Sequence, residues 1–192
     1  MKESLLYKLI RPLLIIWFYP TYRPMIINNK VIPKKAGAIL AGNHTSKKDC
    51  FILGSSTRRP IRFLAKDELT SGRFGFLFKK VGLIPVNRRE KDNTVIPASV
   101  EALNNDAIIA IFPESTINKT KDIIMPFKTG AVRIAIESGK PIIPFAISGN
   151  YTKWKKNVKI TFGKPYFPKS KNIEKENKIL ENKVIALLEN KR

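Results

Sequence analysis

Short apolar runs separated by longer mixed segments make up most of the chain, and they predict strands alternating with helices. The expected strands are residues 38–41, 61–65, 83–86, 107–112, 142–147 and 158–162. The helices expected between them are residues 48–55, 73–81, 94–104 and 130–138. Strands that alternate with helical segments indicate a largely parallel sheet covered by helices on both faces. The pattern therefore predicts an α/β fold in a single domain.

The last segment, residues 173–188, shows a different periodicity. Its apolar positions recur at helical spacing among lysines and glutamates, at Ile179, Leu180, Val184, Leu187 and Leu188. This spacing is typical of an amphipathic helix with one face on a core. We expect a closing helix there, and neither an internal repeat nor a linker indicates a second globular domain.

The most apolar stretch is at the N-terminus, residues 5–19. It is too short to cross a bilayer, which takes about 20 predominantly apolar residues, and Lys8 and Arg11 interrupt it. No small-residue cleavage site follows it, which argues against a signal peptide. We expect a helix that lies in a membrane interface, with docking on the protein's own core as the alternative. On this interpretation residues 1–24 associate with the membrane and residues 25–192 form the catalytic domain.

The side chains of this stretch suit an interface. Aromatic rings favour the headgroup level and basic side chains favour anionic lipid. The aromatic residues are Trp17, Phe18 and Tyr19, and the basic ones are Lys8, Arg11 and Arg23.

Charge narrows the range of partners. The 192 residues include 36 Lys and Arg against 15 Asp and Glu, a net charge of +21. Such an excess indicates an anionic partner: nucleic acid, an anionic membrane surface, an acidic carrier protein or a phosphorylated substrate. The single cysteine, Cys50, excludes an intramolecular disulfide framework, and no Cys/His cluster has metal-ligand spacing. We expect a reducing, cytosolic setting and no metal.

The segment from Asn43 to Asp49 carries the first candidate chemistry. It contains His44, the only histidine, and imidazole can accept a proton near neutral pH. A carboxylate bonded to the far ring nitrogen fixes the tautomer and steadies the imidazolium, a task for which Asp49 is placed. If a strand ends near Gly42 and a helix begins near Lys47, the pair lies at a strand's carboxyl edge, where open α/β sheets hold ligands.

Basic residues at other expected strand ends are candidates for binding phosphate. Arg88 would emerge at the end of strand 83–86, and a guanidinium can hold phosphate through two parallel hydrogen bonds. Lys66 and Arg89 are weaker candidates of the same kind. Lys128 precedes an expected helix N-terminus, a place that favours anions.

The segment after strand 107–112 adds polar groups. Glu114 can accept hydroxyl hydrogens from a polyol substrate. Ser115 and Thr116 bring hydroxyls and backbone N–H groups, the kind of donor that stabilises an oxyanion, although a capped turn would show the same residues. Together with the His-Asp pair, these groups suit acyl transfer onto a phosphorylated alcohol.

In their order and spacing these segments resemble the 1-acyl-sn-glycerol-3-phosphate (lysophosphatidate) acyltransferase family of glycerolipid acyltransferases. The resemblance runs from about Leu5 to Gly149 and includes stretches of sequence between the signature blocks. Four blocks match the family's signatures: Asn43-His44 with Asp49 (the His-x4-Asp motif), residues 82–88, Phe112-Pro113-Glu114 with Thr116, and residues 141–147.

The resemblance implies a glycerol-3-phosphate acyltransferase-like fold and a specific reaction. His44, oriented by Asp49, would remove the proton from the sn-2 hydroxyl of lysophosphatidate as that oxygen attacks an acyl thioester. Arg88, with Lys66 or Lys128, would hold the phosphate, and Glu114 would position the glycerol end. The donor would be acyl-CoA or acyl carrier protein, with no cofactor and no covalent acyl-enzyme, at the cytoplasmic face of an anionic membrane.

One departure from the family and several alternatives remain. The family usually has glycine where this chain has Ser115, and glycine there would allow close backbone approach or a positive φ.

Cys50 as a nucleophile is an alternative, although on a helix it points about 100° away from Asp49. The acceptor could be glycerol-3-phosphate or another lysolipid. A hydrolase using His44 remains a rival, whereas nucleic-acid binding lacks a recognisable motif.

Overall fold

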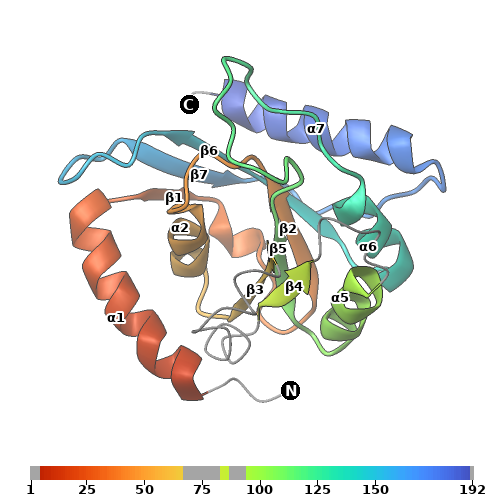
Figure 1. Ribbon diagram of the computed structural model, residues 1–192, viewed down its shortest axis with the longest axis horizontal. Coiled ribbons are helices and arrows are strands. Elements are labelled where there is room, and N and C mark those ends of the chain that lie inside the picture. The colour runs from red at the N-terminus through yellow and green to blue at the C-terminus, as the bar shows by residue number, and fades with distance from the viewer. Residues whose placement is uncertain (1–4, 67–82, 87–93, 191–192) are drawn as a thin grey trace.

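The centre of the molecule is a β-sheet with helices on both faces (Figure 1). The structure is a computed structural model that describes residues 5–66, 83–86 and 94–190. Within these residues the sheet has seven strands in the spatial order β1-β7-β6-β2-β5-β3-β4. Neighbouring strands run parallel except β6 and β7, which are antiparallel. The predicted α/β fold with a largely parallel sheet is therefore confirmed.

The strands lie at the apolar runs from which the sequence predicts them, with one addition. They are β2 (Ala38–Gly42), β3 (Ile61–Lys66), β4 (Ile84–Val86), β5 (Ile108–Ile111), β6 (Ile142–Gly149) and β7 (Val158–Phe162). The addition is β1 (Met25–Ile27), which pairs with β7 at the edge of the sheet. Its Met25 and Ile27 side chains are exposed, so it lacks the hydrophobic alternation that marks a half-buried strand.

The helices form two layers. One face of the sheet carries α1 (Leu5–Tyr22) and α2 (Asp49–Ser56), and the other carries α5 (Val95–Asn104), α6 (Gly130–Ser138) and α7 (Ile173–Glu189). A short 3-10 helix, η1 (Asn29–Val31), follows β1. The closing amphipathic helix is α7, whose Leu180 and Val184 are fully buried against the sheet. The helix predicted at residues 73–81 lies outside the described residues.

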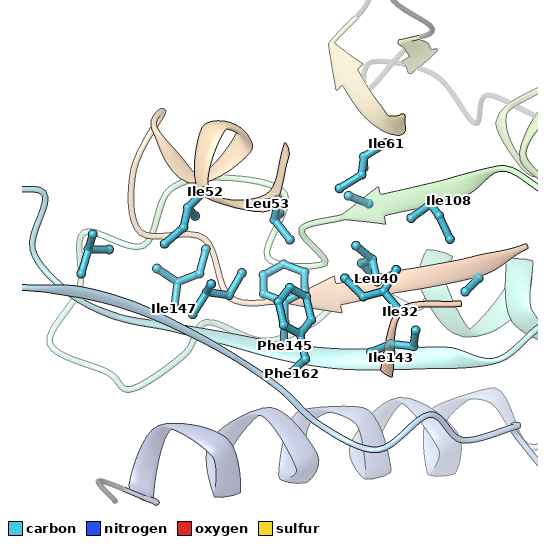
Figure 2. Packing of buried hydrophobic residues seen from close by; sticks show 14 of the residues in the cluster. Ile32, Leu40, Ile52, Leu53, Ile61, Ile108, Ile143, Phe145, Ile147 and Phe162 are labelled. Carbon is cyan, nitrogen blue, oxygen red and sulfur yellow. The ribbon is translucent and has the colours of Figure 1, made fainter. Parts of the chain in front are cut away.

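Side chains that alternate along the strands divide the core between these layers. In β2, Leu40 packs on the side of α1 and α2, whereas Ile39 and Ala41 pack on the side of α5, α6 and α7. Figure 2 shows Ile52 and Leu53 of α2 above this first side of the sheet. Fully burying each of these leucine and isoleucine side chains stabilises the fold by roughly 1.5–3 kcal/mol, so the sheet is a firm base for the loops at its edge.

The end of β2 is fixed to β6 by two neighbouring residues. A Cβ atom on Gly42 would lie 2.1 Å from the Phe145 carbonyl oxygen, so the close approach of β6 requires glycine. The buried Asn43 amide donates to the Ile147 carbonyl oxygen (2.9 Å) and accepts from the Ile147 backbone N–H (2.7 Å). These two hydrogen bonds set the direction in which the chain leaves the sheet, immediately before His44.

Candidate active site

The candidate site lies where two neighbouring parallel strands end. β2 and β5 pair from Ala38 with Ile108 to Ala41 with Ile111, so the segments that follow them leave the same edge of the sheet. His44 follows β2 and Phe112 follows β5, and their rings stack with centroids 4.0 Å apart and planes 18° from parallel. The expected placement of His44 at a carboxyl edge of the sheet is confirmed.

His44 and Asp49 are in direct contact. His44 Nδ1 lies 2.9 Å from Asp49 Oδ2, and the aspartate is fully buried. An ionised carboxylate only accepts hydrogen bonds, so Nδ1 is the donor and Nε2 carries the free lone pair. The His44 side chain is 17% exposed. The pair therefore has the geometry of a base with a fixed tautomer and restricted access to solvent.

The fold of the His44 loop explains why Asp49 holds this position. Helix α2 begins at Asp49 itself, slightly later than predicted, and the carboxylate accepts the backbone N–H groups of Thr45 (2.6 Å) and Ser46 (2.9 Å). An Asp side chain can accept in this way from backbone N–H groups three and four residues earlier in a turn. The same carboxylate thus shapes the turn and orients the imidazole.

Tyr151 is a further partner of Asp49, and the sequence did not predict this contact. Its hydroxyl donates to Asp49 Oδ1 at 2.6 Å. Burial raises the pKa of Tyr151 far above its usual range, and the nearby Asp49 charge raises it further; the phenol therefore stays protonated as a donor. Tyr151 follows β6, distant in sequence from the pair, and only its place just after a strand end marks it.

Glu114 is buried and holds two loops together. One carboxylate oxygen accepts the His44 backbone N–H (2.7 Å) and the other accepts that of Met125 (2.9 Å). Burial raises the pKa of Glu114, while these two hydrogen bonds and His44 act in the opposite direction. Glu114 therefore positions the backbone of the base, and its contact with a substrate stays a prediction.

The neighbouring residues of the turn take different positions. Ser115 has a φ of 61°, in the left-handed region that glycine adopts without steric cost; this conformation accounts for the family's usual glycine there. Thr116 is exposed. Lys128 is also exposed, and its backbone N–H donates to the Pro113 carbonyl oxygen at 3.0 Å, which brings the start of α6 beside the Glu114 turn.

Two predicted phosphate ligands cannot be placed in this arrangement. Arg88, like its neighbour Arg89, lies outside the described residues. Lys66 is the last residue of β3, and its side chain lies outside the described part of the chain. Their proposed roles stay predictions from sequence.

Cys50 is poorly suited to nucleophilic chemistry. Burial, with the neighbouring Asp49 charge, raises the pKa of Cys50 to about 12, and the thiolate is the nucleophilic form of cysteine. Within residues 5–66, 83–86 and 94–190, no group of His, Cys, Asp and Glu side chains is arranged to hold a metal ion. Among the described residues, the His44-Asp49 pair is the candidate for proton transfer, with Nε2 of His44 as its base.

Comparison with known proteins identifies the family. The family model described as Acyltransferase matches residues 23–148. The 1-acyl-sn-glycerol-3-phosphate acyltransferase of Bacillus subtilis is 30% identical over 146 residues, which cover 73% of this chain and 72% of that protein. The probable 1-acyl-sn-glycerol-3-phosphate acyltransferase of Mycoplasma genitalium is 28% identical over 187 residues, covering 93% and 68%.

A solved structure supports the fold. The crystal structure of the 1-acyl-sn-glycerophosphate (LPA) acyltransferase PlsC from Thermotoga maritima superposes with a TM-score of 0.74 at 21% identity, covering 95% of this chain and 78% of that one. The match of the family model includes the histidine-aspartate pair, the Glu114 turn and most of β6. The resemblance seen in the sequence motifs is confirmed, and the chain belongs to the acyltransferase family.

Proposed function

We propose that the protein transfers a fatty acyl group from a thioester to the sn-2 hydroxyl of 1-acyl-sn-glycerol-3-phosphate, giving phosphatidate for phospholipid synthesis. The contact of His44 Nδ1 with Asp49 Oδ2 at 2.9 Å is the observation that carries the proposal. Family membership and the names of the bacterial relatives support this choice of acceptor. The donor is acyl-CoA or acyl carrier protein.

The reaction proceeds by general-base catalysis. His44 Nε2 accepts the hydroxyl proton while the hydroxyl oxygen forms a bond to the thioester carbonyl carbon. The tetrahedral intermediate collapses with cleavage of the carbon-sulfur bond, and the imidazolium returns the proton to the leaving thiolate. Asp49 steadies the imidazolium between these steps. No acyl-enzyme forms, in keeping with the raised pKa of Cys50.

Acceptor binding involves the residues predicted from sequence. We propose that Arg88, with Lys66 or Lys128, holds the phosphate, and that Glu114 uses its remaining lone pairs to position the glycerol end. Ser115 and Thr116 belong to the same turn and supply polar groups near the reacting carbonyl. The exposed lysine at the start of α6 is consistent with this role, because helix N-termini favour anions.

Helix α1 brings the enzyme to its lipid substrate. No helix among the described residues is long and apolar enough to cross a membrane. Phe18 and Tyr22 of α1 are buried in the core, and Arg11 donates to the carbonyl oxygens of Gly54 and Thr57 at the end of α2. The opposite face of α1 exposes the large apolar side chains of Leu9, Leu13 and Ile16. Trp17 lies at the edge of that face, about half exposed, and its ring also contacts those of Tyr22 and Phe51.

This division of α1 supports peripheral membrane binding. One face anchors the helix to the catalytic domain, and the other is apolar and available to lipid, as interfacial helices require. We propose that residues 1–24 are the membrane-associating segment, residues 25–192 the acyltransferase domain, and the cytoplasmic face of the cell membrane the site of action.

Analysis of the lipid products tests the proposed reaction. The purified protein is incubated with lysophosphatidate and either acyl-CoA or acyl carrier protein thioester, and the lipids are identified by mass spectrometry. We expect phosphatidate with at least one donor, absent from the His44→Ala control. Free fatty acid as the only product would indicate a hydrolase. In a parallel incubation, acylation of glycerol-3-phosphate without acylation of lysophosphatidate would identify a different acceptor.

A second prediction concerns Tyr151. Tyr151→Phe removes one charge-assisted hydrogen bond to Asp49 and keeps the ring, so we expect kcat to fall by roughly 3–10-fold, a share of the 1.5–3 kcal/mol typical of such bonds. The KM values for donor and acceptor should stay unchanged because the tyrosine acts through Asp49. Steady-state kinetics measure both quantities.

Tyr166 provides the matched control. Its hydroxyl is also buried, but it has no hydrogen-bond partner within the described part of the chain. Tyr166→Phe should therefore leave kcat unaltered. Equal effects of the two substitutions, or a rise in KM without a fall in kcat for Tyr151→Phe, would rule out a positioning role for the Tyr151 hydroxyl.

A further inference from the structure

The tip of the β6–β7 hairpin has an unusual composition. Residues 153–156 form this tip and read Lys153-Trp154-Lys155-Lys156, all of them exposed. The Trp154 side chain is 63% exposed, a large apolar area for solvent to cover. Hydrophobic burial within this fold therefore does not account for a tryptophan at this position.

The hairpin tip is held in a defined place. Trp154 has a φ of 63°, in the left-handed region, and its backbone N–H donates to the Thr21 carbonyl oxygen at 2.6 Å. At the base of the tip, a hydrogen bond of 3.2 Å from the Asn150 backbone N–H to the Asn157 carbonyl oxygen joins the two sides of the hairpin. The tip is thus fixed against the C-terminal end of α1, as Figure 1 shows for the two elements.

The tip adds exposed apolar surface beside the C-terminal end of α1. Trp17 of α1 is 52% exposed, although its ring also contacts those of Tyr22 and Phe51. The hairpin adds a second exposed tryptophan, Trp154, beside the end of the helix. Tryptophan favours the headgroup level of a bilayer, and lysine is attracted to anionic lipid. The three lysines of the tip supply the charge that complements an anionic surface.

We propose that the hairpin tip is a second lipid-binding element, which docks on an anionic bilayer together with α1. This inference rests on the proposed membrane association and adds a site to it. Trp154 enters the headgroup region while Lys153, Lys155 and Lys156 contact lipid phosphates. Binding at both elements fixes the tilt of the domain relative to the bilayer. With α1 as the only contact, the domain could still rotate about the axis of that helix.

The hairpin also connects the bilayer to the reacting groups. Tyr151, at the base of the tip, donates to Asp49, and its ring contacts Phe18 (centroids 6.2 Å apart) and Tyr22 (5.8 Å) of α1. Both membrane-binding elements therefore meet next to the catalytic pair. Docking on the two elements places that pair close to the surface from which the acceptor lipid is drawn.

Tryptophan fluorescence tests the tip separately from the helix, because the chain has 2 tryptophans. Trp17→Phe leaves Trp154 as the only reporter, and Trp154→Phe leaves Trp17. Each variant is mixed with vesicles of phosphatidylcholine and phosphatidylglycerol, with and without brominated lipid. We expect a blue shift and bromine quenching for both reporters.

Replacing the lysines tests the charge. Each lysine near an anionic surface contributes roughly fivefold in affinity, so replacing Lys153, Lys155 and Lys156 with glutamine should weaken vesicle partitioning by on the order of 100-fold. The matched control is the triple glutamine substitution of Lys164, Lys169 and Lys171, exposed lysines between β7 and α7, away from the tip (Figure 1). We expect a much smaller loss for the control, and pure phosphatidylcholine should bind the unaltered protein weakly.

The outcomes separate the two proposals. Quenching of Trp17 without quenching of Trp154 would overturn the hairpin site and leave membrane binding by α1 intact. Quenching of neither reporter would overturn both. Equal losses from the two lysine triples would show that net charge, rather than the tip, attracts the bilayer. If Trp154 responds to acidic acyl carrier protein and not to vesicles, the tip binds the donor and the lipid assignment is wrong.

Discussion

His44→Ala is expected to lower turnover by at least ~100-fold, the lower range for loss of a general base. Nε2 of His44 is the basic atom of the pair, because Nδ1 is committed to Asp49 at 2.9 Å. Alanine leaves the acceptor hydroxyl without a proton acceptor. The measurement is kcat for ester formation with lysophosphatidate and the donor found to be active.

The substitution should leave the fold intact. Asp49 keeps its hydrogen bonds from the Thr45 and Ser46 backbone N–H groups and from the Tyr151 hydroxyl, so the carboxylate is not left unpaired. The midpoint of thermal unfolding provides the check. His44→Gln is a second variant, which retains a side-chain donor for Asp49 but has no basic nitrogen, and it should be as slow as alanine. Near-normal turnover in either variant would exclude His44 as the base.

Part of this site could be predicted because its residues are close together along the chain. His44 and Asp49 lie within one turn between a strand and a helix, so their spacing alone allowed the contact that the structure contains. The buried strands were predictable for a similar reason, since all residues of β2 and β5 are buried and apolar runs mark such strands. In both cases the determining interactions are close along the chain or repeat along one element.

The remaining contacts depend on segments that meet only in the folded chain. Glu114 reaches His44 across a sequence separation of 70, and Tyr151 reaches Asp49 across 102. A sequence shows an acidic residue after a strand but not that backbone N–H groups occupy both its oxygens. The interpretation of Glu114 as a substrate ligand therefore omitted its contact with the His44 backbone.

The N-terminal helix is another element whose long-range contacts could not be predicted from its own sequence. Its composition predicted an interfacial helix, with docking on the protein core as the alternative. The structure shows docking through Phe18 and Tyr22 on one side and an exposed apolar face on the other. The two interpretations are therefore compatible, because they concern different faces of the same helix.

Asp49→Asn is expected to lower kcat by roughly 10²–10⁴-fold, as when a neutral amide replaces the carboxylate that orients a catalytic histidine. The amide has nearly the shape of the carboxylate, so the main loss is the negative charge that steadies the imidazolium. An amide turned with its NH₂ group toward Nδ1 would also impose the wrong tautomer. The KM for the acceptor should change little, since the fully buried Asp49 side chain has no exposed surface for substrate.

The double variant His44→Ala/Asp49→Asn distinguishes this role from a direct one. If Asp49 acts only through the imidazole, removing it from an enzyme that already lacks His44 should cost no further activity, so the double variant should turn over as slowly as His44→Ala and no more slowly. Groups that act as one unit give such non-additive losses. Two effects that multiply would mean that Asp49 contributes independently of His44. Unfolding midpoints of all variants then separate that outcome from a loosened turn at Thr45 and Ser46, whose backbone N–H groups the carboxylate also binds.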